Sequence, residues 1–324
     1  MPTSFAHQQT IEAFKSHIQT AVIGKPEAVD LAITGFLAGS HILLEDVPGT
    51  GKTLLARSMA RAFSGQFQRI QFTSDMMPAD ITGSSIFNMK SGNFEFIPGP
   101  IFAHIVLADE INRATPRSQS SLLEVMEENQ VTVDGKTYPL ERPFFVVATQ
   151  NPLESYGTFP LPESQLDRFV LSFSMGYPDL NTEAQILQLH RKNLKENNSR
   201  FLESRLEAVL TPEQVRAAQA EVATVEVSDE LEQLLLHMIH LTREDARFRA
   251  GASTRAAVAF LRALQAYAYL KGRPYATPED LKYLAPYILN HRVVFQQNFN
   301  RQQKDEALRT MVGEVFAQHK QLLR

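Results

Sequence analysis

The first half of the chain alternates between short apolar runs and amphipathic segments. The apolar runs are nearly continuous, which is typical of strands buried on both faces of a parallel sheet. Segments with helical periodicity lie between them, for example residues 54–63 and 119–128. This alternation predicts a parallel α/β sheet. The five predicted strands are residues 41–45, 69–73, 105–108, 144–149 and 169–173.

Two segments interrupt this alternation with the pattern of β-hairpins. Residues 85–96 turn at Ser91-Gly92-Asn93, and residues 130–138 turn at Asp134-Gly135. An Asp-Gly pair between two alternating arms strongly favours a hairpin. A plain strand–helix repeat has no necessary place for either hairpin. Both are therefore predicted as insertions, which either decorate the sheet edge or have a role of their own.

The pattern changes near residues 176–179, where strand signals stop and helical segments continue to the end of the chain. Cap-like residues begin several of these helices, and in two cases a proline follows at the first helical position. We therefore expect an α/β core over residues 1–175 and a helical domain over residues 176–324. The predicted helix starts are Thr211-Pro212, Ser228-Asp229, Ser253-Thr254 and Thr277-Pro278.

Composition places the chain among globular proteins and removes several kinds of chemistry. Apolar residues make up 44% and charged residues 21% of the 324 residues, and the net charge is −4. Such a balance offers no basic field for nucleic acid. Because the chain has no cysteine, disulfides, thiol catalysis and thiolate metal sites are excluded. With neither a signal peptide nor a membrane span in the pattern, we expect a cytoplasmic protein.

The first candidate site directly follows the first predicted strand, where the chain reads Asp-Val-Pro-Gly-Thr-Gly-Lys-Thr and then becomes helical. The glycines let backbone N–H groups curl around an anion, and the helix N-terminus adds positive potential. Lys52 is expected to reach the β- and γ-phosphates, and the Thr53 hydroxyl to ligate Mg²⁺. The strict pattern has glycine at position 46. Asp46 departs from it at the strand exit, away from the glycines nearest the phosphates.

A second candidate motif ends the predicted strand at residues 105–108, where Asp109 and Glu110 follow. Strand ends in α/β sheets face the ligand crevice. Asp109 is placed to hold Mg²⁺, and Glu110 to polarise a water for attack on the γ-phosphate. Acidic pairs end many strands simply by meeting solvent. The motif therefore gains its meaning from the phosphate loop that precedes it.

Together, these motifs resemble those of the MoxR family of AAA+ ATPases. Residues 48–53 are similar to the Walker A motif, and residues 108–114 to the family's Walker B motif. The resemblance extends from about Val22 to Arg292. It implies an AAA+ core with a five-stranded parallel sheet and two hairpin insertions, followed by a helical lid. Further motifs in the family's order are residues 97–102, 148–152 and 161–169.

The resemblance assigns two residues of the core to the γ-phosphate. Asn151, at the sensor-1 position, would hold the attacking water, and an Asn-Pro turn is the structural alternative. Arg168, at the arginine-finger position, would reach the γ-phosphate of a neighbouring subunit. An ion pair with Asp167 or another nearby carboxylate is the alternative for Arg168. Local sequence alone favours that ion pair, so the family match carries the assignment.

Arg255 corresponds to the sensor-2 arginine of the lid. Ser253 or Thr254 is expected to cap the helix and to leave Arg255 in its first turn. A cation there opposes the helix dipole at a cost of about 0.3–1 kcal/mol. An anion in front of the helix end would reverse the sign, and a nucleotide phosphate is the obvious candidate. The alternative is an arginine that turns into solvent.

The resemblance thus implies Mg²⁺-dependent hydrolysis of ATP to ADP and phosphate by a hexameric ring. The predicted catalytic residues are Lys52, Glu110, Asn151, Arg168 and Arg255. The predicted metal ligands are Thr53 and Asp109. The predicted nucleotide contacts are Val22, Ile23 and Gly24 against the adenine, the loop residues Pro48, Gly49, Thr50, Gly51, Lys52, Thr53 and Leu54, and Asp109 and Arg255.

The resemblance also implies partners: a protein client that is remodelled or matured, and often a protein with a von Willebrand factor A domain. The two hairpins would face the pore of the ring, although Phe94 and Phe96 equally suit a hairpin core. Three other readings stay open. A nucleic-acid motor of the same clade is disfavoured by the acidic balance. A magnesium-chelatase-like ATPase subunit shares the hairpins, and a nucleotide-gated scaffold is disfavoured by the intact Glu110.

Several other charged residues allow a simpler interpretation. Arg113 and Arg117 flank the second motif and either contact a neighbouring subunit or solvate a helix start. His237 and His240 have a spacing compatible with metal binding, but a zinc site usually needs three or four ligands, so a structural pair is favoured. A cluster of carboxylates is most simply a solvated helix face. That cluster consists of Glu124, Glu127 and Glu128.

Overall fold

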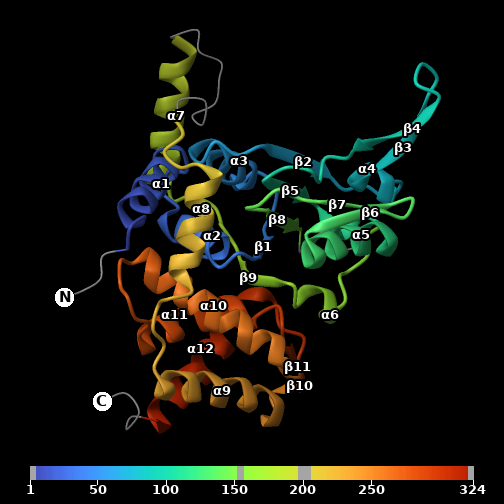
Figure 1. The fold of residues 1–324 in the computed structure, drawn as a ribbon. Helices are drawn as coiled ribbons and strands as arrows, with labels where there is room; N and C mark the ends of the chain where they lie inside the picture. Colours follow the sequence, from blue (N-terminus) through green and yellow to red (C-terminus); the bar gives the residue numbers. More distant parts are fainter. Residues whose placement is uncertain (1–4, 152–156, 196–205, 320–324) are drawn as a thin grey trace.

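A five-stranded parallel sheet forms the centre of the protein, in the order β2-β5-β8-β1-β9 (Figure 1). The computed structural model describes residues 5–151, 157–195 and 206–319. Pro152, the last residue of one predicted motif, lies outside them. The predicted sheet is confirmed. Its strands are β1 (His41–Glu45), β2 (Phe67–Gln71), β5 (Ile105–Asp109), β8 (Phe145–Gln150) and β9 (Phe169–Phe173).

The bounds of β2 differ most from the prediction, because β2 begins two residues before the predicted segment at 69–73. It is an edge strand, and Ile70 is its one buried residue. Every residue of β5 and β9 is buried, by contrast. A strand covered on both faces reads as a continuous apolar run, whereas a half-exposed edge strand gives a weaker signal.

Helices cover both faces of the sheet, and alternate strand residues point to opposite faces. On one face, α1 (Gln8–Ala21), α2 (Pro26–Leu37) and α3 (Lys52–Ala62) pack against residues such as Ile42 and Leu44. On the other, Leu43 belongs to a second apolar cluster. That cluster includes residues of α4 (Pro78–Thr82) and α5 (Pro116–Glu128).

Both predicted hairpins are confirmed. One consists of β3 (Gly83–Asn88) and β4 (Asn93–Pro98), and it projects from the body of the protein (Figure 1). The other consists of β6 (Gln130–Val133) and β7 (Lys136–Pro139). Phe96 of the first stacks on Tyr138 of the second, with ring centroids 4.1 Å apart. The two insertions are therefore in contact with each other.

The second half of the described chain is mainly helical, and all four predicted helix starts are confirmed as caps. Each cap side chain accepts a backbone N–H of the first turn. The expectation that strand structure ends near residue 176 is wrong. Phe248–Ala250 (β10) pairs with Val294–Phe295 (β11), a contact too short to give a periodic pattern. The helices are α7 (Leu180–Lys195), α8 (Pro212–Val222), α9 (Asp229–Glu244), α10 (Thr254–Leu270), α11 (Pro278–Leu289) and α12 (Arg301–Gln318).

The helical part is docked on β9 through polar contacts. The His291 ring contacts the carbonyl of Phe169 at 2.8 Å, and Arg301 donates to the carbonyl of Ser172 at 2.7 Å. Arg292 is buried and donates to the carbonyl of Val170 at 3.0 Å. The larger apolar cluster runs from α1 to α12 without a break at residue 176. The domain boundary between residues 175 and 176 therefore remains a prediction.

In the described residues, no helix has the length and apolarity that a membrane crossing requires.

Candidate functional site

The predicted phosphate loop joins β1 to α3. Gly49 and Gly51 have φ angles of 86° and 95°, in the left-handed region that favours glycine. Gly51 caps α3, which begins at Lys52. The loop therefore presents the first turn of a helix at the carboxyl end of a central strand, as anion binding requires.

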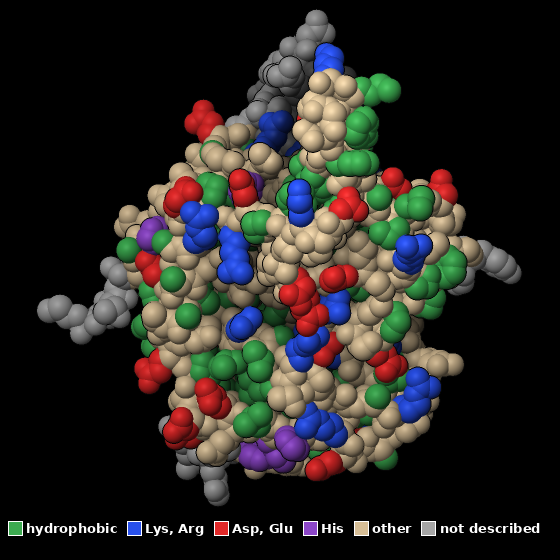
Figure 2. All heavy atoms as spheres, turned by 45° about the vertical axis from the view of Figure 1, so that its right-hand side comes forward, with side chains coloured by type: hydrophobic (Ala, Val, Ile, Leu, Met, Phe, Trp, Pro, Cys, Tyr) green, Lys and Arg blue, Asp and Glu red, His purple; other side chains and the backbone are tan. Residues whose placement is uncertain are grey.

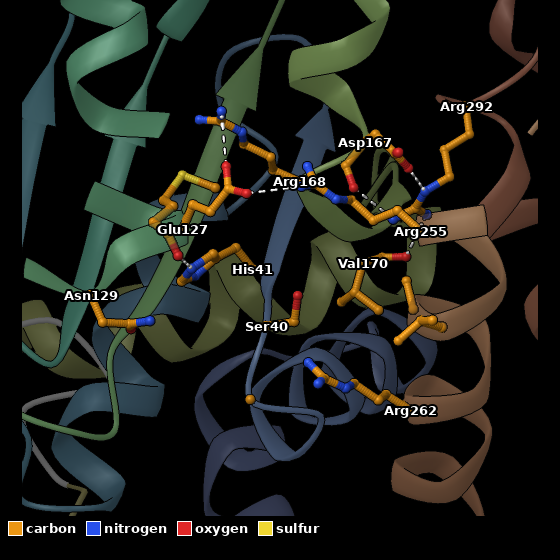
Figure 3. A pocket seen from close by; sticks show the side chains of 14 residues that line it. Ser40, His41, Glu127, Asn129, Asp167, Arg168, Val170, Arg255, Arg262 and Arg292 are labelled. Carbon is orange, nitrogen blue, oxygen red and sulfur yellow. Dashed lines mark hydrogen bonds and ion pairs between the residues drawn. The ribbon is translucent and has the colours of Figure 1, made fainter. Parts of the chain in front are cut away.

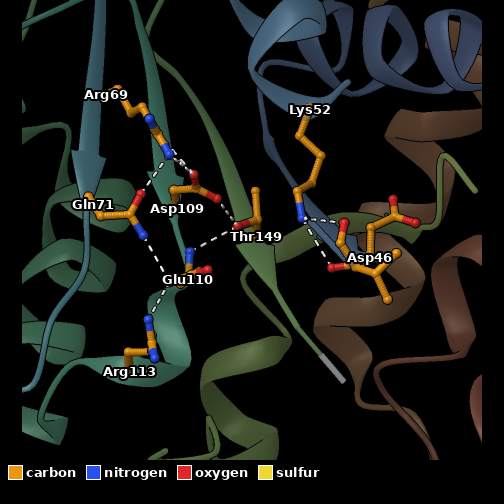
Figure 4. A network of polar contacts seen from close by, with 9 residues as sticks. Asp46, Lys52, Arg69, Gln71, Asp109, Glu110, Arg113 and Thr149 are labelled. Carbon is orange, nitrogen blue, oxygen red and sulfur yellow. Dashed lines mark hydrogen bonds and ion pairs between the residues drawn. The ribbon is translucent and has the colours of Figure 1, made fainter. Parts of the chain in front are cut away.

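Lys52 is buried, and its ammonium group turns back onto its own loop (Figure 4). Lys52 Nζ donates to the carbonyl oxygens of Asp46 at 3.1 Å and Val47 at 3.3 Å. These neutral acceptors hold the lysine in place at the rim of the loop. Thr53 follows it in the first turn of α3.

Asp109 ends β5 and is held by two neighbouring strands. Its Oδ1 accepts the hydroxyl of Thr149 at 2.6 Å, and its Oδ2 accepts Nη2 of Arg69 at 2.6 Å (Figure 4). Sequence reasoning missed both partners. The signals were a threonine inside the apolar run of β8 and an arginine inside β2, but neither has meaning until the strands are ordered.

Glu110 has a φ of 58°, unusual for a residue with a side chain. Its N–H donates to the Thr149 hydroxyl at 2.9 Å, so the same threonine positions both acidic residues. Its Oε2 accepts Gln71 at 2.9 Å and Arg113 at 3.0 Å. Arg113, which the sequence left between two roles, thus pairs with Glu110 within the chain.

Asn151 is buried directly after β8, between the ends of β5 and β1. Because these strands are parallel, their carboxyl ends lie at one edge of the sheet. The structure therefore brings together Lys52, Asp109, Glu110 and Asn151, which the sequence assigned to one site.

The segment Val22-Ile23-Gly24 lies beside the start of α7. A Cβ atom added at Gly24 would come within 2.3 Å of the Thr182 side chain, so only glycine allows this approach. Lys25 Nζ donates to the carbonyl of Tyr177 at 2.7 Å. Segment 22–24 is thus attached to the residues that follow β9.

Arg168 and Arg255 meet at the opposite edge of the sheet (Figure 3). Arg168 Nη2 contacts Glu127 Oε2 at 3.0 Å, and Arg255 Nη2 contacts Glu127 Oε1 at 2.8 Å. Glu127 is exposed, as predicted for a solvated helix face, but its two ion pairs give it a role that the prediction did not include. Its partners come from the residue before β9 and from α10, which periodicity within α5 cannot reveal.

The position of Arg255 in the first turn of α10 is confirmed, and Ser253 is the cap. The carboxylate of Glu127 faces this helix end, so the exposed Arg255 side chain is paired with Glu127 and does not lie beside Lys52. Arg168 precedes β9, whereas the phosphate loop follows the parallel strand β1. A strand of five residues spans roughly 16 Å at about 3.3 Å per residue. Within one chain, the two arginines and the phosphate loop are therefore separated by the depth of the sheet.

The two arginines line a pocket of about 260 Å³. Nε of Arg168 is buried there and has no hydrogen-bond partner among the described residues. A buried N–H without an acceptor is costly, so this wall of the pocket suits an anion. The other charged or titratable residues that line it are His41, Glu127, Asp167, Arg262 and Arg292.

His41 lies at the floor of this pocket, at the start of β1. Its Nε2 contacts the carbonyl of Met126 at 3.1 Å, and its Nδ1 accepts the N–H of Val146 at 3.0 Å. Burial lowers the pKa of His41 to about 4, partly offset by the contact with Met126. The ring is therefore neutral at pH 7 and adds no charge to the pocket.

Comparison with protein families gives two matches. A family described as "ATPase family associated with various cellular activities (AAA)" matches residues 41–171, and an AAA lid domain matches residues 240–311. The first match covers the phosphate loop, the acidic motif and Arg168, and the second covers Arg255.

Individual proteins match over nearly the whole chain. The uncharacterized protein YeaC of Bacillus subtilis is 44% identical over 92% of each chain. Chaperone MoxR1 of Mycobacterium tuberculosis is 35% identical over 89% of this chain and 77% of its own. A crystal structure from Cytophaga hutchinsonii, provisionally assigned as an ATPase, is 36% identical with a TM-score of 0.83, covering 96% of this chain and 94% of that one.

Proposed function

Because the chain belongs to the MoxR family of AAA+ ATPases, we propose that it hydrolyses ATP with Mg²⁺ at a site completed by a neighbouring subunit. The observation that carries this proposal is the pairing of Arg168 and Arg255 on Glu127, at the sheet edge opposite Lys52. Neither arginine can serve the phosphate loop of its own chain from there. Both can serve the loop of an adjacent copy.

The loop and Lys52 bind the phosphates. Phosphate oxygens are charged acceptors, so they compete well for the Lys52 ammonium group against the two carbonyls that hold it now. The loop amides and the first turn of α3 supply the remaining donors.

Thr53 and Asp109 would hold Mg²⁺, because a hydroxyl and a carboxylate are the hard oxygen donors that this ion prefers. In the described part of the chain, no group of three or more His, Asp or Glu side chains could hold a metal. An ion bound mainly by phosphates and water does not need such a group. When bound, Mg²⁺ neutralises charge on the phosphates.

Glu110 is the general base, and Asn151 positions the attacking water. The Glu110 carboxylate now accepts from Gln71 and Arg113. Both donors bond to Oε2, so at least one of them must move aside for that oxygen to accept a hydrogen bond from the attacking water.

Arg168 and Arg255 stabilise the charge that develops on the γ-phosphate of the adjacent chain. The phosphate replaces Glu127 as their acceptor and satisfies the buried Nε of Arg168. In this proposal Arg255 acts on the γ-phosphate of the adjacent chain, together with Arg168, and not on the nucleotide of its own chain. A ring, hexameric by family resemblance, provides one such junction per subunit.

We further propose remodelling of a protein client in the cytoplasm, with a partner that contains a von Willebrand factor A domain. A relative named as a chaperone and the projecting β3–β4 hairpin support a protein client. Acidic and basic side chains are interspersed on the face in Figure 2. This face therefore has no continuous basic patch for the phosphates of a nucleic acid, which agrees with the net charge of −4.

The test measures specific ATPase activity against protein concentration for the wild type and for Arg168→Ala. We expect wild-type activity to rise with assembly and the variant to be nearly inactive at every concentration. A mixture of Arg168→Ala and Glu110→Gln should regain activity, because each supplies the half-site that the other lacks. Equal activity of wild type and Arg168→Ala at all dilutions would refute the composite site.

A further inference from the structure

Asp46 stands where the strict phosphate-loop pattern has glycine, and its side chain leaves the loop for the exit of β9. Its Oδ2 accepts the N–H of Met175 at 2.6 Å. Its Oδ1 accepts the Ser174 hydroxyl at 2.6 Å and the Gly176 N–H at 3.1 Å. A buried carboxylate with three donors on consecutive residues is strongly held.

The backbone of Asp46 makes two further contacts. Its carbonyl accepts Lys52 Nζ at 3.1 Å, and its N–H donates to the carbonyl of Gln150 at 3.1 Å. Gln150 immediately precedes Asn151. Asp46 thus contacts three parts of the protein: Lys52 of the loop, the end of β8 and the residues that follow β9.

The segment that Asp46 holds, residues 174–182, also reaches the predicted adenine side of the site. The carbonyl of Tyr177 accepts Lys25 Nζ, and Thr182 packs against Gly24. Asp179 accepts the N–H of Thr182 at 2.8 Å and so fixes the start of α7. Residues 174–182 therefore contact both the phosphate loop, through Asp46, and the segment that is predicted to lie against the adenine.

We infer that Asp46 is a positioning residue that fixes the phosphate loop against residues 174–176 and couples bound phosphates to the segment leading into α7. The inference rests on the proposed function, because it concerns nucleotide bound at this loop. A glycine at position 46 would match the general phosphate-loop pattern better than Asp46 does. It would nevertheless remove all three side-chain contacts and weaken ATP binding.

The experiment compares ATP·Mg²⁺ binding by wild type, Asp46→Gly and Asp46→Asn, using calorimetry. The matched control is Asp245→Asn, because Asp245 likewise accepts a backbone N–H, from Arg247 at 2.8 Å, but lies in the helical part. We expect Asp46→Gly to raise Kd at least about tenfold, Asp46→Asn to lie between it and wild type, and the control to stay within about twofold.

Hydrogen–deuterium exchange of residues 173–179 supplies a readout that a loss of stability alone would not give. In wild type, the Met175 and Gly176 amides should exchange slowly, and ATP should slow this segment further. In Asp46→Gly the two amides should exchange at least about tenfold faster. ATP should then no longer change the exchange of the segment, even at concentrations that saturate the variant.

The outcomes separate the inference from the proposed function. If wild type does not bind ATP, both are refuted. If wild type binds and Asp46→Gly binds equally well with unchanged exchange, the inference alone is refuted. Should Asp46→Gly fail to fold, Ser174→Ala removes one donor and leaves the loop intact. That variant should raise Kd about threefold, and an unchanged Kd with unchanged exchange would overturn the inference.

Discussion

Ser253 of the lid donates its hydroxyl to Asp167 of the core at 2.6 Å. The same serine caps α10 by accepting the N–H of Ala256. Asp167 also accepts Nε of the buried Arg292 at 2.7 Å. Asp167 immediately precedes Arg168, and Ser253 lies two residues before Arg255. This contact therefore fixes the positions of Arg168 and Arg255, the two proposed γ-phosphate arginines, relative to each other.

Replacement of Ser253 by Ala should lower ATPase activity more than its effect on stability explains. Loss of the cap costs about 0.5–2 kcal/mol of stability. Ser228→Ala removes an equivalent cap from α9, where the side chain accepts the N–H of Leu231. Because Ser253→Ala also loses the bond to Asp167, we expect it to lose at least as much thermal stability as Ser228→Ala, while kcat falls several-fold only in Ser253→Ala. Equal kcat in the two variants would mean that the contact with Asp167 does not position Arg168 and Arg255 for catalysis.

Replacement of Glu127 by Gln should increase hydrolysis. The Glu127 carboxylate holds both arginines in the free chain and would repel a phosphate that approaches them. A partly exposed ion pair is worth about 0.2–1 kcal/mol, so we expect an increase in kcat/KM of up to about fivefold with little change in stability. Glu124→Gln, an exposed neighbour on α5, is the control. A decrease in kcat/KM for Glu127→Gln would show instead that Glu127 pre-aligns the arginines.

The sequence predicted the elements of this fold well where one chain segment contains the whole signal. Continuous apolar runs identified buried strands such as β5, and cap residues such as Ser253 identified helix starts. The Asp-Gly pair identified the hairpin of β6 and β7. The edge strand β2 and the short pair β10–β11 were less well predicted because little of each is buried or periodic.

The candidate site was predictable only as two motifs and a family resemblance. The loop and the acidic pair carry their chemistry in consecutive residues. The contacts of Asp46 with Met175 and of Glu127 with Arg255 join residues that are more than a hundred positions apart. No local pattern predicts such pairs, because strand order and the docking of the lid create them.

Replacement of Glu110 by Gln should abolish turnover and preserve ATP binding. Glutamine keeps the size of the side chain and an acceptor for Gln71, but it cannot take a proton from water. Loss of a general base costs about 10²- to 10⁴-fold in rate. Binding by calorimetry and phosphate release in single turnovers measure the two effects separately. A turnover rate close to that of wild type would assign the base to another residue.

Stability should fall as the pH decreases from about 6.5 to about 4, and His41 should contribute to this loss. The pKa of His41 is lowered by burial from its usual 6.5 to about 4. The unfolded chain therefore binds a proton in this range before the folded chain does, which favours unfolding. The expected loss from His41 is about 2 kcal/mol at pH 5 relative to pH 7. Burial also lowers the pKa of His291 and that of His104, so the three effects have the same sign.

His41→Gln isolates this contribution, because glutamine offers a donor and an acceptor but does not titrate. The variant should be less stable than wild type at pH 7, because the amide N and O of glutamine do not reproduce the positions of the two ring nitrogens that contact Met126 and Val146. Its urea midpoint should nevertheless change less than that of wild type between pH 7 and pH 5. His240→Gln, at an exposed position on α9, controls for the loss of a histidine as such. Parallel pH profiles for wild type and His41→Gln would show that His41 is not buried as a neutral ring, because a histidine with a normal pKa in both states contributes no pH dependence to unfolding.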